Sequence, residues 1–112
     1  MTTKEMYRAA AAHAAAEGSA FLDALSRALA FFRARYGDRA ISKDGEAIVC
    51  PRSLEEESGL HELFDRPVVD YILFCLTGER DYRSEALVGA DDAYRTRWRD
   101  RAAGRNLRKE AW

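Results

Sequence analysis

The sequence predicts a mainly α-helical protein: a small single-domain bundle of four to five helices spanning residues 1–112, with a short β-hairpin insertion near residues 40–49. Three observations support this class. Large apolar residues recur at helical spacing over residues 20–36, and residues 68–76 are apolar nearly all round. Residues 4–17 are rich in alanine, the strongest helix former. A chain of 112 residues is also long enough for one modest core.

Composition separates this chain from disordered and from strongly charged proteins. Apolar residues make up 47% of it, although 20 of them are alanines, so large core-forming side chains are scarce. Disorder requires a high net charge as well as few apolar residues, and the net charge here is only −1. A near-neutral chain is neither a uniformly basic nucleic-acid coat nor a purely acidic mimic.

The first half of the chain is expected to begin with two helices that form a hairpin. Residues 4–17 are helical on propensity alone, and Gly18 closes this helix. Ser19 then caps a second helix over residues 20–36, which Gly37 ends. The apolar stripe of the second helix repeats every three or four residues, as Phe21, Leu25, Leu29, Phe32 and Tyr36.

The segment that follows changes character. Two short β-capable runs, residues 40–42 and 47–49, flank the pair Asp44-Gly45, and this pattern is typical of a small hairpin. Residues 53–56 fit a capping box, in which a serine hydroxyl and a glutamate carboxylate satisfy free backbone donors. That box predicts a helix of one or two turns.

The next expected helix is the most buried one. Asp65 and Pro67 suit its first turn, and residues 68–76 form its body. A buried strand is the alternative for so short an apolar run, but the proline before it and Gly78 after it favour a helix. Residues 77–90 are expected to form a polar connection with at most one short turn.

A last helix is expected over residues 93–103, capped by Asp91 or Asp92. Gly104 either breaks it or only kinks it. The charge is polarised along this half of the chain, because residues 44–92 carry a net −9 and residues 93–112 a net +5.

The basic end of the chain supplies the first candidate partner-binding residues. On a continuous helix, four arginines form one ridge: Arg97, Arg101, Arg105 and Arg108. Tyr94 and Trp98 lie on the neighbouring stripe, and guanidinium groups beside aromatic rings suit phosphates and stacked bases. The alternative is that both aromatic residues pack into the core while the arginines are solvated or paired with glutamates.

The acidic run Glu55, Glu56 and Glu57 is the second candidate partner-binding set. It is expected to act as an acidic docking patch or, in the plainer interpretation, as a solvated face in which Glu56 serves as a capping residue. A third possibility at this end of the run is a metal site from Glu57, His61 and Asp65, which repeat at intervals of four. Gly59 interrupts that repeat, and the ligand number is below what zinc and di-iron sites normally show.

No catalytic, cofactor-binding or metal-binding residues are assigned, and the protein is not expected to be an enzyme. Cys75 lies in the apolar run and is expected to be an inert core thiol. Cys50, next to Pro51, has no neighbour in sequence that would activate it. The chain contains no phosphate-binding loop, no His-Glu-x-x-His, no Cys-x-x-Cys and no nucleophile elbow.

Location and assembly are predicted by default. No stretch reaches 18 apolar residues and the N-terminal residues do not fit a signal peptide, so no membrane contact, a cytoplasmic location and reduced thiols are expected. The alanine-rich N-terminal helix, with Met6 and Tyr7, and the off-stripe Phe31 face either a second copy, giving a homodimer, or the rest of the chain.

By elimination, the sequence predicts a non-catalytic protein-binding module. Such a module is an accessory subunit, an adaptor or an inhibitor or regulator of a larger protein partner, and it acts through charged surfaces. The alternative is a nucleic-acid-binding or regulatory protein that uses the basic C-terminal helix.

Overall fold

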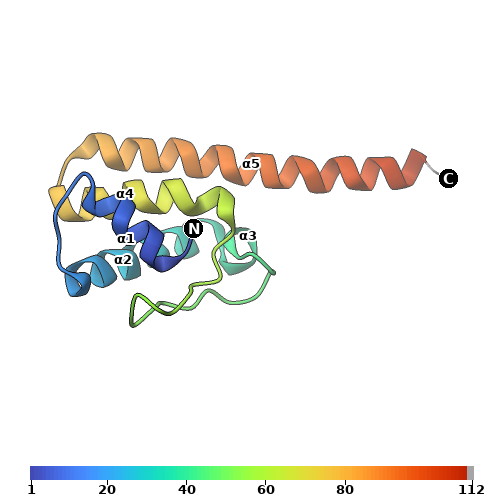
Figure 1. The fold of residues 1–112 in the computed structure, drawn as a ribbon. Helices are drawn as coiled ribbons and strands as arrows, with labels where there is room; N and C mark the ends of the chain where they lie inside the picture. Colours follow the sequence, from blue (N-terminus) through green and yellow to red (C-terminus); the bar gives the residue numbers. More distant parts are fainter. Residues whose placement is uncertain (111–112) are drawn as a thin grey trace.

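The computed structural model describes the backbone of residues 1–110 and the side chains of residues 1–98, and in that part of the chain five α-helices and one 3₁₀ turn follow one another. They are α1 (Thr3–Ala11), α2 (Gly18–Tyr36), α3 (Asp38–Ile41), the 3₁₀ turn η1 (Glu62–Phe64), α4 (Asp65–Thr77) and α5 (Arg80–Glu110). Helix α4 lies along α5 and also packs on α1 and α2 (Figure 1). The predicted mainly α-helical class is confirmed.

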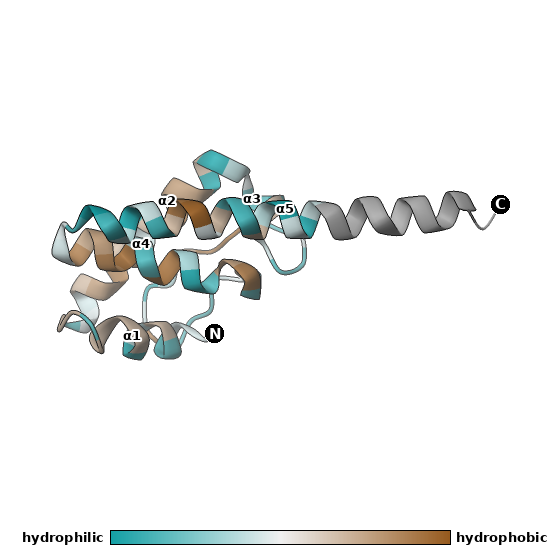
Figure 2. Cartoon of the chain, turned by 90° about the horizontal axis from the view of Figure 1, so that it is seen from above, coloured by the Kyte–Doolittle hydropathy of each residue, from teal (hydrophilic) through white to brown (hydrophobic). Residues whose placement is uncertain are grey.

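The core is built around the apolar stripe of α2. Its residues Phe21, Leu25, Leu29 and Phe32 are at most 1% exposed, as the spacing predicts, and Tyr36 at the end of the stripe is half-buried. The buried apolar side chains of the described residues form one cluster. In it, the stripe of α2 packs on the inner face of α4, which consists of Val68, Val69, Ile72 and Leu73. Hydrophilic and apolar residues alternate along α5 (Figure 2).

Helix α1 is shorter than expected because its ends are fixed by polar groups. Thr2 and Glu5 form a capping box at its start, with the Glu5 N–H donating to the Thr2 hydroxyl at 3.1 Å. Helix α1 ends at Ala11, and the following segment turns back so that the Tyr7 hydroxyl donates to the Ala16 carbonyl at 2.8 Å. The expected helix over 4–17 is therefore wrong in its second half.

The start of α2 also differs from the expectation. Gly18 is the first residue of α2 and does not close α1, and Ser19 lies inside the helix. Glu17 occupies the N-cap position without a side-chain hydrogen bond. Met6 is buried and the Tyr7 ring meets the edge of the Phe21 ring at 5.2 Å, so both side chains face the rest of the chain.

The predicted hairpin at 40–49 is wrong: the described residues contain no strand. The first two residues of the first run, Ala40 and Ile41, belong to α3, and a single bridge joins Ser42 to Leu60. The Lys43 N–H donates to the carbonyl of Gly59 at 2.7 Å, so the segment pairs with residues 58–61 and not with its own second half. The physical reason is burial, because Ile41 and Ile48 both reach the core and cannot also lie on one exposed ribbon.

Residues 53–56 form a single turn, so the helix predicted from the capping box is wrong. The Glu56 N–H donates to the Ser53 carbonyl at 3.3 Å, and the Glu56 carboxylate accepts from the Arg52 N–H at 3.1 Å. The Ser53 hydroxyl accepts from the Glu55 N–H at 3.3 Å, so the reciprocal box between Ser53 and Glu56 is not formed and the turn does not continue as a helix. Gly59, at φ +81°, then redirects the chain toward η1.

The helix predicted over 68–76 is confirmed as the body of α4, which ends at Gly78 with φ +76°. A left-handed residue at this position is what a glycine C-cap provides. The predicted role of Asp65 as a cap is wrong, because Phe64 occupies the N-cap position and the Asp65 carboxylate accepts instead from the Met1 ammonium.

The predicted polar connection over 77–90 is wrong, because α5 begins at Arg80. The buried stripe of this helix has helical spacing but is made of small residues, which give a weak apolar signal: Ala86, Ala90 and Ala93. A side chain added at Gly89 would lie only 3.3 Å from the Pro67 ring, so the two helices approach closely. The backbone of α5 runs without a break through Gly104, and no helix in the described part of the chain is long and apolar enough to cross a membrane.

Candidate functional site

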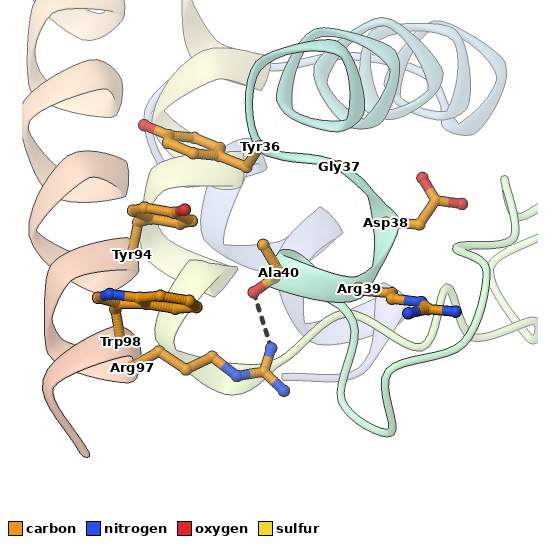
Figure 3. A pocket seen from close by; sticks show the side chains of 8 residues that line it. All are labelled: Tyr36, Gly37, Asp38, Arg39, Ala40, Tyr94, Arg97 and Trp98. Atoms are coloured by element: carbon orange, nitrogen blue, oxygen red, sulfur yellow. Dashed lines mark hydrogen bonds between the residues drawn. The ribbon is translucent and has the colours of Figure 1, made fainter. Parts of the chain in front are cut away.

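A groove of about 370 Å³ lies between α5 and the turn that joins α2 to α3. Its lining residues define what we call the aromatic groove: Tyr36, Gly37, Asp38, Arg39, Ala40, Tyr94, Arg97 and Trp98. Figure 3 shows the three rings one above another on one side and the turn on the other. The groove thus joins residues from two segments that are far apart in the sequence.

Two local features position the aromatic side. Tyr94 and Trp98 are four residues apart on α5, so they lie on the same face of the helix. The Tyr94 ring stacks on the ring of Tyr36 at 5.2 Å between centroids. Trp98 is 54% exposed and Tyr94 is 37% exposed, so the interpretation in which both pack into the core is wrong.

The turn side depends on Gly37, whose φ of +86° is a conformation that favours glycine. This conformation ends α2 and starts α3 within one residue. The Arg97 guanidinium then donates to the carbonyls of Ala40 at 2.8 Å and of Ser42 at 2.7 Å. Figure 3 draws the first of these bonds. Arg97 therefore holds the turn against α5.

Only the first member of the predicted basic ridge can be placed at the side-chain level. Arg97 belongs to the groove, whereas the side chains of Arg101, Arg105 and Arg108 lie outside the described residues. The ridge as a whole stays a prediction.

The acidic groups near the groove are engaged by neighbours within the chain. The Tyr36 hydroxyl donates to the Asp91 carboxylate, which lowers the pKa of Asp91, while burial raises the pKa of Tyr36. The Arg33 guanidinium donates to Asp38 at 2.8 Å and lowers the pKa of that carboxyl. The lowered pKa values keep both carboxylates ionised. Arg39, on the same turn, is exposed to solvent.

The acidic run lies elsewhere, against the start of α1. Glu55 pairs with the Lys4 ammonium at 2.9 Å, and Glu57 accepts from the Thr3 N–H at 3.2 Å. Glu56 accepts from the Arg52 N–H, as described above. None of the three glutamates lines the aromatic groove, so the structure does not bring the two predicted partner-binding sets together.

The residues Glu57, His61 and Asp65 of the possible metal site each have another partner in the chain. His61 stands at the N-cap of η1, where its Nδ1 accepts from the Leu63 N–H at 3.1 Å, and Asp65 is bound to the Met1 ammonium. Among the described residues, no group of three or more His, Cys, Asp or Glu side chains could hold a metal ion. Both cysteines are half-buried free thiols, and burial raises the pKa of Cys75.

The lining residues offer aromatic rings, guanidinium groups and backbone carbonyls as contact surfaces. Aromatic faces and edges, one exposed guanidinium and backbone carbonyls can hold a flat or apolar group and a carboxylate. None of the eight lining residues is a serine, cysteine or histidine. The protein-family models, curated proteins and solved structures compared with this chain include no match to it.

The sequence predicts Arg97 as a partner-binding residue and places Tyr94 and Trp98 on the neighbouring stripe, and all three line the groove. The spacing of Tyr94 and Trp98 places them on one face and is a signal for a shared surface. No spacing in the sequence indicates that Tyr36 and Arg39 also line the groove, because their place there depends on how α3 folds against α5.

Proposed function

We propose that this chain is a non-catalytic protein-binding module, an accessory subunit, adaptor or regulator of a larger protein, and that its contact surface is the aromatic groove. One observation carries the proposal: Trp98 is 54% exposed at a groove that two tyrosines and two arginines also line. Tryptophan, tyrosine and arginine are the residues that most often dominate the binding energy of protein interfaces.

The chemistry of the lining residues selects the partner segment. An apolar or aromatic side chain would gain contact with the exposed faces of Tyr94 and Trp98. A carboxylate beside it would pair with Arg39, since the carboxylates of Asp38 and Asp91 are already engaged. We therefore propose an acidic protein segment with one large apolar anchor.

The direct test is selection from a phage-displayed library of random linear peptides on the purified protein. Selected peptides are expected to share an aromatic or large aliphatic residue next to Asp or Glu. Trp98→Ala is expected to weaken their binding about tenfold or more, the loss typical of a hot-spot residue. Val88→Ala is the matched control, because Val88 is also an exposed apolar residue of α5, at 65%, and does not line the groove.

The proposal is contradicted if no selected peptide depends on Trp98, or if Val88→Ala weakens binding as much as Trp98→Ala. Circular dichroism of both variants checks that α5 is retained. Both side chains are exposed, so both variants are expected to melt close to the wild-type protein.

Nucleic acid is the second candidate, because exposed aromatic rings next to guanidinium groups also suit stacked bases and phosphates. Fluorescence anisotropy with a single-stranded oligonucleotide separates it from the first. Affinity that falls steeply with salt and is reduced by both Trp98→Ala and Arg39→Ala would favour nucleic acid. Salt-insensitive or absent oligonucleotide binding, together with Trp98-dependent peptides, would favour the protein partner.

A further inference from the structure

A second cavity, of about 220 Å³, lies on the other side of α4, where α1, α4 and α5 meet. Ala9, Val69 and Leu73 give it apolar walls. Its polar side chains are those of Asp70, Glu85, His13, Arg66 and Tyr82. Its volume is below the roughly 300 Å³ at which sites for drug-sized ligands begin, so it suits a small group.

The feature that sets this cavity apart is the carboxylate of Asp70. Asp70 lies in the middle of α4 and is only 7% exposed, yet it lines the cavity and makes no hydrogen bond with any described residue. A buried carboxylate without a hydrogen-bond donor is costly, and most such groups have a partner. Asp70 thus has carboxylate oxygens at the cavity that accept no hydrogen bond from a described residue, although Arg66 forms an ion pair with one of them.

The nearest cation, Arg66, also lines the cavity and forms an ion pair with this carboxylate, but it does not donate a hydrogen bond to it. The Arg66 Nε lies 3.7 Å from an Asp70 oxygen, beyond hydrogen-bond distance, and the Arg66 side chain is 83% exposed. Arg66 precedes Asp70 by four residues, the less favourable order for a helical ion pair. A second carboxylate, that of Glu85 on α5, adds negative charge to the same cavity.

We propose that this cavity binds a primary ammonium group carried on a short apolar chain. The ammonium would donate to the Asp70 carboxylate, and the methylene groups would contact the apolar walls formed by Ala9, Val69 and Leu73. Such a group occurs on free alkylamines and at the end of a lysine side chain. The site is separate from the aromatic groove, so this inference does not depend on the proposed function.

Acid is expected to weaken this binding. Burial raises the pKa of Asp70, whereas an alkylammonium group stays charged throughout the acidic range. Three charged or titratable groups act on Asp70 from the elements around it: Arg66 on α4, Glu85 on α5 and His13 beyond α1. The Tyr82 hydroxyl and the Met1 ammonium, which Asp65 already holds, complete the surroundings. Protonation of Asp70 removes the charge that pairs with the ammonium group, so affinity falls as the pH falls.

The probe is butylammonium chloride, followed by ¹⁵N–¹H correlation spectra of the full chain. Chemical shifts are expected to move at residues around Asp70, and butanol, the neutral analogue, is expected to bind about tenfold more weakly or worse, the loss that follows when a charge-assisted hydrogen bond is removed. Asp70→Asn is expected to reduce the affinity for butylammonium by a similar factor. Asp23→Asn is the matched control, because Asp23 is an exposed carboxylate with its own arginine four residues away.

A further comparison identifies whether the ammonium group belongs to a free amine or to a protein side chain. A blocked tripeptide with a central lysine, compared with its acetyl-lysine counterpart, tests a chain-borne group. Binding of butylammonium alone indicates a free amine, and binding of the lysine peptide alone indicates a protein side chain. The proposal is overturned if neither binds, if butanol binds equally well, or if Asp70→Asn retains the affinity. The pH dependence of the wild-type protein tests the role of Asp70 without a variant, because affinity that stays constant on acidification contradicts that role.

Discussion

Helices α2 and α5 both pack on α4, but they do so with opposite kinds of side chain. The buried face of α2 consists largely of phenylalanines and leucines, whereas that of α5 consists of alanines at 86, 90 and 93. A stripe of large residues fills the space between helices, and a stripe of small residues lets the helices come close. The first kind of interface is visible in the sequence, and the second is not.

The two interfaces are expected to be destabilised by different kinds of substitution. Each large side chain of α2 removes enough apolar area from water to contribute about 1.5–3 kcal/mol, so truncation is the damaging change there. An alanine methyl group contributes little by itself, so α5 depends on close approach and enlargement is the damaging change. Four variants, from the largest expected effect to the smallest, test this contrast.

Phe32→Ala is expected to lower the free energy of unfolding by about 3–5 kcal/mol, because Phe32 is fully buried and its loss leaves a cavity. Urea unfolding followed by circular dichroism measures the change. The adjacent Phe31 is only half-buried, so Phe31→Ala is expected to cost less. Equal losses for the two variants would show that the buried stripe is not the main support of α2.

Ala90→Leu is expected to cost about 1–3 kcal/mol in the same unfolding experiment, since the added carbons have no space between α5 and α4. Val88→Leu, on the exposed side of the same helix, is expected to stay within about 0.5 kcal/mol of the wild-type protein. If Ala90→Leu is neutral or stabilising, the close approach of the two helices is wrong.

Arg97→Ala is expected to lower stability by about 1–2 kcal/mol, because it removes two charge-assisted hydrogen bonds to the carbonyls of Ala40 and Ser42. Chemical denaturation again provides the measurement, and the exposed neighbour Arg95→Ala is the control. Similar, negligible effects of both variants would mean that polar contacts do not hold the far part of α5.

The smallest effect concerns α4, the helix on which both others pack. Burial raises the pKa of Asp70 above its ordinary value of 3.8. As the pH rises between the unfolded and the folded pKa, the unfolded chain releases this proton first, and the free energy of unfolding falls. The Asp70→Asn variant has no such proton to release, so its stability relative to the wild-type protein is expected to increase with pH across that window and stay constant above it. Unfolding curves at several pH values measure the difference, and a pH-independent difference would contradict the raised pKa.

The same contrast explains which parts of the fold are predictable. The body of α2 and that of α4 follow from large apolar residues and from helix-ending signals such as Gly37 and Gly78, which are local. The first half of α5 resembles a polar connection in sequence because its interface is made of alanines. The predicted hairpin is wrong because Ile41 and Ile48 are buried in a core formed from distant segments. Turn propensity is a local property and does not report this long-range packing.

The candidate site is predictable only in part, for a related reason. Arg97 is identified by its spacing on a basic helix, although its guanidinium binds backbone carbonyls at the end of α3. The aromatic groove needs Tyr36 opposite Tyr94, and this pairing depends on how the helices dock. The acidic run at residues 55–57 is identified as a charged set, but a run of like charges does not predict the individual contacts that its members make with α1 and the nearby backbone.

The bridge between Ser42 and Leu60 has a consequence for the order in which the chain folds. Its hydrogen bonds join the two ends of a long segment with no regular helix or strand of its own, so they form only after α3 and α4 have been brought together. Closing such a loop costs conformational entropy, and these few hydrogen bonds offset that cost only once the loop has closed. We therefore expect this segment to become ordered after α2 and α4, and its amides to exchange with solvent sooner than those of these two helices.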